Sequence, residues 1–197
     1  MSHLTQTTWA FALAATCATA WSQAEAAPPV KAQVKALAVA ADPLKRAVLI
    51  GRVATSGMVL QLELEGAEAM WMPMGSPPVW GAHSPGADER YHVELKLDDT
   101  KTKTRIPYAN VTFEATNATT GKTATLTLPP MWGSSGLHYS ANSALLGDGA
   151  YDVTVKVDVP TFQRELKDKD LWSKPVYANF HFKLINGKLT EVSALKQ

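Results

Sequence analysis

The sequence predicts an all-β protein in which about seven to nine short strands form a β-sandwich. Three observations support this prediction. Apolar and polar residues alternate over several short segments, turn-forming residues separate those segments, and no long amphipathic helix is visible. Alternation with a period of two is typical of strands that place one face on a core and the other in water.

The first expected strands begin at about Ala47. The residue pattern changes to a period of two near this position and favours strands at 47–53 and 58–64. In residues 90–97, polar side chains at the even positions alternate with apolar side chains at the odd positions. A strand here therefore has one polar face and one apolar face.

Four more strands are expected in the second half of the chain. Residues 109–116 and 122–128 are separated by a short turn-forming segment and are expected to pair as a hairpin. Residues 151–159 and 176–184 each alternate between apolar and polar side chains. An Asn-Gly turn signal follows the last of these strands.

The region before the strands divides into two parts. Residues 1–26 are expected to be an export signal, because an apolar, alanine-rich run that is too short to cross a bilayer is followed by small residues suited to cleavage. Residues 27–46 are rich in Ala, Pro and Lys and are expected to be a linker or arm. The single domain is then expected to occupy residues 47–197.

The only cysteine, Cys17, lies inside the expected export signal. The residues before it fit a lipoprotein cleavage site poorly, so lipid attachment is not expected there. The mature chain would contain no thiol, and a metal would have to be held by His, Met, Asp or Glu.

The net charge of +1 and the lack of a basic patch with interleaved aromatics argue against nucleic-acid binding. Hydrolytic and phosphate-binding motifs are missing as well, so the chain is not expected to be an enzyme.

His92 and Glu94 are the first candidate metal ligands. Residues two apart on a strand point to the same face, so the imidazole and the carboxylate project together. The pair can supply two ligands to one metal ion. Read without other information, the same residues also fit an ordinary solvated strand face, which Arg90 and Lys96 share.

Met131 and His138 stand at opposite ends of a segment that contains two glycines and two serines. Such a segment can fold tightly, and the two side chains could then converge. A methionine in this place is also compatible with simple packing. A single histidine is equally compatible with an ordinary hydrogen bond.

A second group of candidate ligands lies in the methionine-rich segment at 70–74. Alternation on a strand would place Met70, Met72 and Met74 on one face, and thioethers are soft ligands that favour copper(I). A sulfur-rich core strand or a dimer contact is the alternative interpretation. His83 follows in a loop and could join this possible second site, or could be a free surface histidine.

Several short motifs occur in a characteristic order along the chain. They are His92-x-Glu94, Ile106-Pro107-Tyr108, Pro130-Met131, Gly136-Leu137-His138-Tyr139 with Asn142, Gly149-x-Tyr151 and Pro160. Together they resemble the periplasmic iron-transport proteins, binding Fe2+ or copper, that accompany Ftr-type iron permeases and include a treponemal metal-binding lipoprotein. The resemblance covers about residues 58–184 and is most specific over 128–160.

The resemblance implies an immunoglobulin-like sandwich, a homodimer, and a metal site near the dimer interface. The implied ligands are His92, Glu94, Met131 and His138. A further histidine of the family's motif is replaced by Glu165 in this chain. A carboxylate in place of an imidazole makes the site harder and favours iron or manganese over copper(I), unless the site is altered or lost.

The sequence therefore favours an exported, periplasmic protein that binds an iron or copper ion and assists iron uptake through an Ftr-type permease in the inner membrane. Two other hypotheses stay open. One is an exported β-sandwich interaction module that has lost its metal site. The other is a copper-handling protein that uses the cluster from Met70 to Met74.

Overall fold

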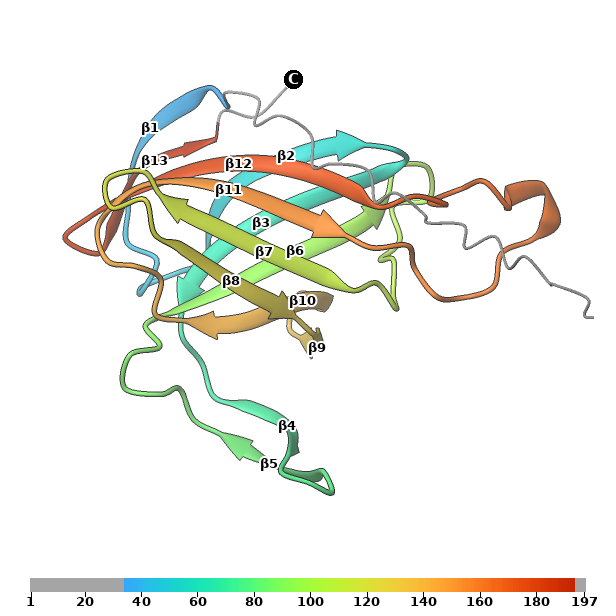
Figure 1. Ribbon diagram of the computed structural model, residues 1–197, viewed down its shortest axis with the longest axis horizontal. Coiled ribbons are helices and arrows are strands. Elements are labelled where there is room, and N and C mark those ends of the chain that lie inside the picture. The colour runs from blue at the N-terminus through green and yellow to red at the C-terminus, as the bar shows by residue number, and fades with distance from the viewer. Residues whose placement is uncertain (1–33, 194–197) are drawn as a thin grey trace, which may run out of the picture.

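The computed structural model describes residues 34–193, so the expected export signal and Cys17 lie outside the described part. Its strands form two antiparallel sheets that pack face to face, and a separate two-stranded hairpin extends from one end of them (Figure 1). This architecture confirms the predicted all-β, immunoglobulin-like sandwich. Over residues 34–193, no helix has both the length and the apolar character needed to span a bilayer.

The larger sheet has six strands in the order β1-β13-β12-β11-β7-β8. All of its neighbouring strands are antiparallel. Its strands are β1 (Ala36–Ala41), β7 (Val111–Asn117), β8 (Thr123–Leu128), β11 (Gly149–Val157), β12 (Val176–Ile185) and β13 (Lys188–Ser193).

The smaller sheet of the sandwich has five strands in the order β2-β3-β6-β10-β9. Its strands are β2 (Val48–Thr55), β3 (Met58–Gly66), β6 (Tyr91–Asp99), β9 (Pro130–Gly133) and β10 (Gly136–Ser143). The separate hairpin consists of β4 (Met70–Met74) and β5 (Val79–His83), and the short helix η1 (Leu166–Asp168) follows β11.

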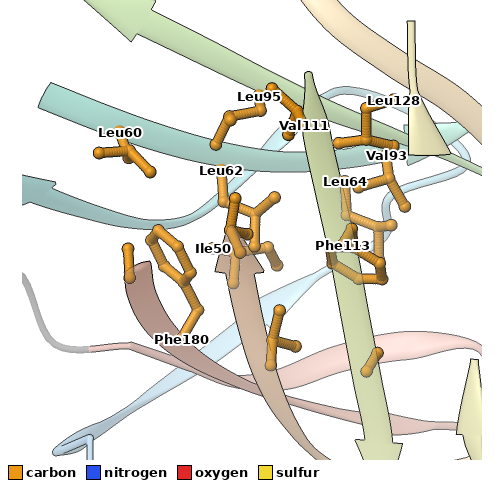
Figure 2. Close-up of a cluster of buried hydrophobic side chains, with 14 of the residues drawn as sticks. Ile50, Leu60, Leu62, Leu64, Val93, Leu95, Val111, Phe113, Leu128 and Phe180 are labelled. Atoms are coloured by element: carbon orange, nitrogen blue, oxygen red, sulfur yellow. The ribbon is translucent and has the colours of Figure 1, made fainter. Parts of the chain in front are cut away.

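The hydrophobic core lies between the two sheets. Figure 2 shows Leu62 and Leu95 of the smaller sheet facing the region occupied by Phe113 and Phe180 of the larger one. On β6, the odd-numbered residues from Tyr91 to Leu97 are in this core. The even-numbered residues of β6 therefore lie on the opposite face of the smaller sheet.

The structure contains more strands than the sequence predicted. Residues 36–41, within the segment expected to be an arm, form β1 and pair with β13. This edge strand is mostly exposed and alanine-rich, so it carries no clear alternation of buried and exposed positions. The β4–β5 hairpin and the four-residue strand β9 were likewise not expected as separate strands.

Candidate metal site

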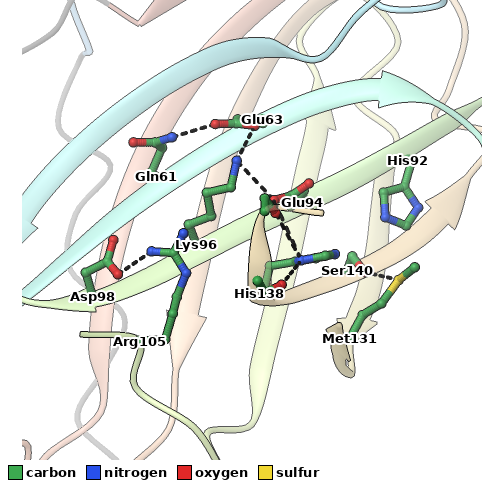
Figure 3. Close-up of polar contacts among 12 residues, drawn as sticks. Gln61, Glu63, His92, Glu94, Lys96, Asp98, Arg105, Met131, His138 and Ser140 are labelled. Carbon is green, nitrogen blue, oxygen red and sulfur yellow. Dashed lines mark hydrogen bonds and ion pairs between the residues drawn. The ribbon is translucent and has the colours of Figure 1, made fainter. Parts of the chain in front are cut away.

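Four of the predicted ligands, His92, Glu94, Met131 and His138, lie on the face of the smaller sheet that points away from the core. In the register of β6 and β10, His92 is opposite Asn142 and Glu94 is opposite Ser140. His138 lies farther along the same face of β10 and is paired with Met131 on β9. Figure 3 shows the side chains of His92, Glu94 and His138 together with Met131 and Ser140 on one side of the sheet.

The ring of His92 is fully buried and held in one orientation. Its Nδ1 lies 2.8 Å from Oδ1 of Asn142. The amide of Asn142 donates from Nδ2 to the carbonyl oxygen of Glu68 over 2.9 Å, which identifies its Oδ1 as the acceptor. Nδ1 of His92 therefore carries the proton, and Nε2 presents its lone pair. That Nε2 is buried and has no hydrogen-bond partner among the described residues.

The ring of His138 is constrained in the same way. Its Nδ1 lies 2.9 Å from the carbonyl oxygen of Gly136, which can only accept a hydrogen bond. The proton is again on Nδ1, and the buried Nε2 again lacks a partner within the described chain. Buried polar atoms are nearly always satisfied in folded proteins, so these two nitrogens on one face are available to bind a ligand.

Glu94 is the anionic group closest to His138. Its carboxylate is 7% exposed and has one oxygen 3.8 Å from Nδ1 of that imidazole. The same oxygen accepts hydrogen bonds from Ser135 over 2.9 Å and from the ammonium of Lys96 over 3.1 Å. Burial by itself would raise the pKa of the Glu94 carboxyl. The imidazole and the two hydrogen-bond donors outweigh burial, so this pKa lies below its ordinary value and Glu94 is ionised.

Met131 contributes a thioether at the edge of the same face. Its Sδ accepts a hydrogen bond from the hydroxyl of Ser140 over 3.2 Å. Ser140 lies directly opposite Glu94 in the sheet, so this hydrogen bond holds the sulfur on the same face as Glu94. Two imidazole nitrogens, a carboxylate and a thioether form a donor set that suits iron or copper.

His92 is directed partly away from the other three predicted ligands. Its Nε2 lies 3.5 Å from a carboxylate oxygen of Glu68, just after the end of β3. Glu65 is opposite His92 in the register of β3 and β6. Burial, with the nearby carboxylates of Glu68 and Glu94, raises the pKa of Glu65 above its ordinary value. Sequence reasoning did not select Glu65 or Glu68, because only the pairing of β3 with β6 brings them to His92.

Glu165 lies outside this group of residues. It immediately precedes η1, is exposed, and forms an ion pair with Lys167 over 2.9 Å. Figure 1 shows its loop apart from β9 and β10. Within one copy of the described chain, no hydrogen bond or ion pair connects Glu165 with the other predicted ligands.

The methionine-rich segment forms β4 and projects from the sandwich with β5 (Figure 1). Met70 is paired with His83 across this hairpin, and Met72 with Gly81. Met74, also on this face, is 40% exposed. The register therefore brings the possible second group of ligands to one face of the hairpin. His83 lies 3.9 Å from Glu89 and is otherwise accessible.

Comparison with known proteins identifies one family. Residues 80–185 match the family described as Fe2+ transport protein. This match covers more than half of the chain and includes β6, β9 and β10. No curated protein matches the chain.

Solved structures with the same architecture include proteins of two bacteria. FetP of uropathogenic Escherichia coli strain F11, as isolated after expression in the periplasm, is 25% identical with a TM-score of 0.56, covering 71% of this chain and 97% of FetP. Copper-reconstituted P19 of Campylobacter jejuni is 23% identical with a TM-score of 0.53, covering 76% and 99% of the two chains. A copper-bound variant of FetP has 24% identity, a TM-score of 0.55, and coverage of 71% and 93%.

Proposed function

This chain belongs to the family of Fe2+ transport proteins, and we propose that it is an exported protein that binds iron or copper and assists iron uptake. The proposed ligands are His92, Glu94, Met131 and His138. The metal is cargo in this proposal. The residues around it bind the ion and hold the ligands in position.

The observation that carries the proposal is the state of the two histidines. His92 and His138 each have Nδ1 bound to an acceptor oxygen and a buried Nε2 with no hydrogen-bond partner in the described chain. Second hydrogen bonds of this kind fix the tautomer of metal-binding histidines and raise their basicity. The Nε2 lone pairs of both rings are thus available before a metal binds, and that of His92 faces Glu68.

Export, dimer formation and the permease partner belong to the same proposal. The alanine-rich leader supports export, and copper-containing structures of FetP and P19 support a metal-related role. We include a homodimer because Glu165 is exposed and separate from the other ligands of its own chain. A second copy could bring Glu165 to the metal. The partner in uptake would be an Ftr-type permease of the inner membrane.

Calorimetry of the purified protein with anaerobic Fe2+, and separately with copper, tests the proposal. We expect one tightly bound ion per chain in the wild type. Combined His92→Ala and His138→Ala substitutions should abolish this binding, whereas His181→Ala on the larger sheet should retain it. Unchanged affinity in the double variant would rule out the site. No binding of either metal would favour the interaction module without a metal.

A copper-handling role for the hairpin is the second candidate function. The cross-strand pairing of Met70 with His83 favours it, because a thioether and an imidazole then share one face. Its signature would be copper(I) binding that persists in the double histidine variant. Loss of that binding on replacement of the three methionines would assign it to the hairpin.

A further inference from the structure

We propose that Glu65, Glu68 and His92 form a separate position for a hard divalent cation, Fe2+ or Mn2+, beside the site at Glu94, Met131 and His138. This inference rests on the proposed function in so far as iron is the cargo. It adds a position built mainly from oxygen ligands, which the sequence motifs do not contain.

The three side chains converge although they come from separate parts of the sheet. One ligand atom from each of them lies within 4.8 Å of the others. Glu65 is on β3, directly opposite His92 on β6. Glu68 follows β3, and its carboxylate oxygen reaches to 3.5 Å from Nε2 of His92.

Asn142 fixes two members of this cluster relative to each other. Its Oδ1 accepts from the backbone N–H of Glu68 over 3.3 Å, and its Nδ2 donates to the carbonyl oxygen of the same residue over 2.9 Å. Oδ1 also accepts the proton of His92 Nδ1. One amide therefore aligns the imidazole and the backbone that carries the carboxylate. Support of this kind is typical of residues that orient metal ligands.

The charges of the cluster favour a cation. The lone pair of His92 Nε2 faces a carboxylate oxygen, so a proton or a metal ion between them makes the contact favourable. Within residues 34–193, neither Glu65 nor Glu68 forms an ion pair with Lys or Arg. Lys96, which lies on this face, is bound to Glu63 over 2.8 Å and to Glu94 over 3.1 Å. A divalent ion would offset the two neighbouring carboxylates.

The chemistry of the ligands distinguishes the two positions. Carboxylates with a single imidazole suit Mn2+ and Fe2+, whereas a thioether selects softer ions such as copper(I). Because Nδ1 of His92 is occupied by Asn142, only Nε2 can bind a metal. His92 can therefore serve one position at a time, and in this structure it faces the carboxylates.

Mn2+ and copper(I) are the probes for the test, with Mn2+ followed by electron paramagnetic resonance and copper(I) by competition with a chromophoric chelator. Combined Glu65→Gln and Glu68→Gln substitutions should weaken Mn2+ binding by about ten-fold or more and leave copper(I) binding within about three-fold. Met131→Leu should have the reverse pattern. Glu114→Gln, an exposed carboxylate on β7, is the matched control and should change neither affinity. Circular dichroism verifies that each variant is folded.

The outcomes separate this inference from the proposed function. Mn2+ binding that survives the double glutamine variant overturns the inference, as does copper(I) binding by a wild-type protein that does not bind Mn2+. The site at Met131 and His138 would stand in both of those cases. A wild-type protein that binds neither probe overturns both proposals. Nitrogen coupling to Mn2+ from one imidazole, lost in His92→Gln, would support the inference directly.

Discussion

The side-chain amide of Asn142 accepts the Nδ1 proton of His92 over 2.8 Å and thereby decides which nitrogen of that imidazole is available. The amide cannot rotate to present its nitrogen instead, because its Nδ2 is bound to the carbonyl oxygen of Glu68. Asn142 therefore acts on the metal through His92. It is a positioning residue, and its effect should be visible in the absence of metal.

Replacement of Asn142 by leucine should weaken metal binding without unfolding the protein. The variant loses the acceptor for Nδ1, so His92 can exchange its tautomer and its orientation. Loss of such a supporting group lowers metal affinity by about 10–100-fold. Calorimetry measures the affinity, and nitrogen NMR of the metal-free protein reports the tautomer of His92.

Asn179→Leu on β12 is the control, because Asn179 lies in the larger sheet, away from the site, and accepts a hydrogen bond from Thr154 on the neighbouring strand β11. It should leave the affinity and the tautomer of His92 unchanged. A wild-type affinity in Asn142→Leu would show that the amide does not position the ligand.

The predictable and unpredictable parts of this site differ in how they depend on strand pairing. Alternation along residues 90–97 predicts that His92 and Glu94 share a face, because that property is local to one strand. The contact between His92 and Glu68 depends on the register of β3 and β6, which no local pattern reports. Glu68 also lies after the end of β3, where the alternation has stopped. The same limit applies to Ser140, whose hydrogen bond to Met131 connects β10 with β9.

Replacement of Glu94 by glutamine should destabilise the protein near neutral pH and lose this effect in acid. The folded-state pKa of Glu94 is lowered, so its ionised form stabilises the fold above the unfolded-state pKa of about 4.3. The contribution disappears as the pH falls through the folded-state pKa. Urea unfolding should show a loss of about 1–3 kcal/mol near pH 7, since charged hydrogen bonds to Ser135 and Lys96 are removed.

Glu114→Gln, which replaces an exposed carboxylate, controls for the change in net charge. It should shift the unfolding free energy by less than about 0.5 kcal/mol at either pH. If the difference between wild type and Glu94→Gln stayed constant down to strongly acidic pH, the ionised carboxylate would not be its source.

Replacement of Glu65 by glutamine should have the opposite sign in the metal-free protein. Burial and neighbouring carboxylates raise the folded-state pKa of Glu65, so its ionisation above that pKa opposes folding. Glu65→Gln should therefore stabilise the chelator-treated protein near pH 7 by on the order of 0.5 kcal/mol, since partial exposure screens the repulsion. The gain in stability should vanish below the unfolded-state pKa.

Saturating Mn2+ should instead stabilise the wild type more than the Glu65→Gln variant. Equal stabilisation of both proteins would contradict the proposed metal position at Glu65, Glu68 and His92.

Tyr139 follows His138 on β10, and its side chain is in the core, on the opposite face of the sheet from His138. Its hydroxyl donates to the carbonyl oxygen of Ile106 over 2.8 Å and accepts from the backbone N–H of Ala109 over 3.1 Å. Tyr139→Phe leaves both buried groups without this partner and should lower the unfolding free energy by about 1–3 kcal/mol. Thermal and urea unfolding provide the measurement. Tyr177→Phe, at a half-buried position on β12, should be nearly neutral, and equal effects of the two substitutions would contradict the role of the Tyr139 hydroxyl.

The β4–β5 hairpin tests whether copper binds away from the sandwich. Combined substitution of Met70, Met72 and Met74 by leucine removes the thioethers while conserving most of the side-chain volume, so the fold should persist. If the hairpin binds copper(I), the variant should lose one bound ion in a chelator competition, while Mn2+ binding stays unchanged. His83→Ala should reproduce part of this loss, because His83 is paired with Met70 across the hairpin.

Met58→Leu, in the core and outside the hairpin, is the matched control for loss of a thioether. A copper(I) stoichiometry that is the same in wild type and in the triple variant would leave the hairpin without a role in metal binding and would assign all of the copper to the sheet.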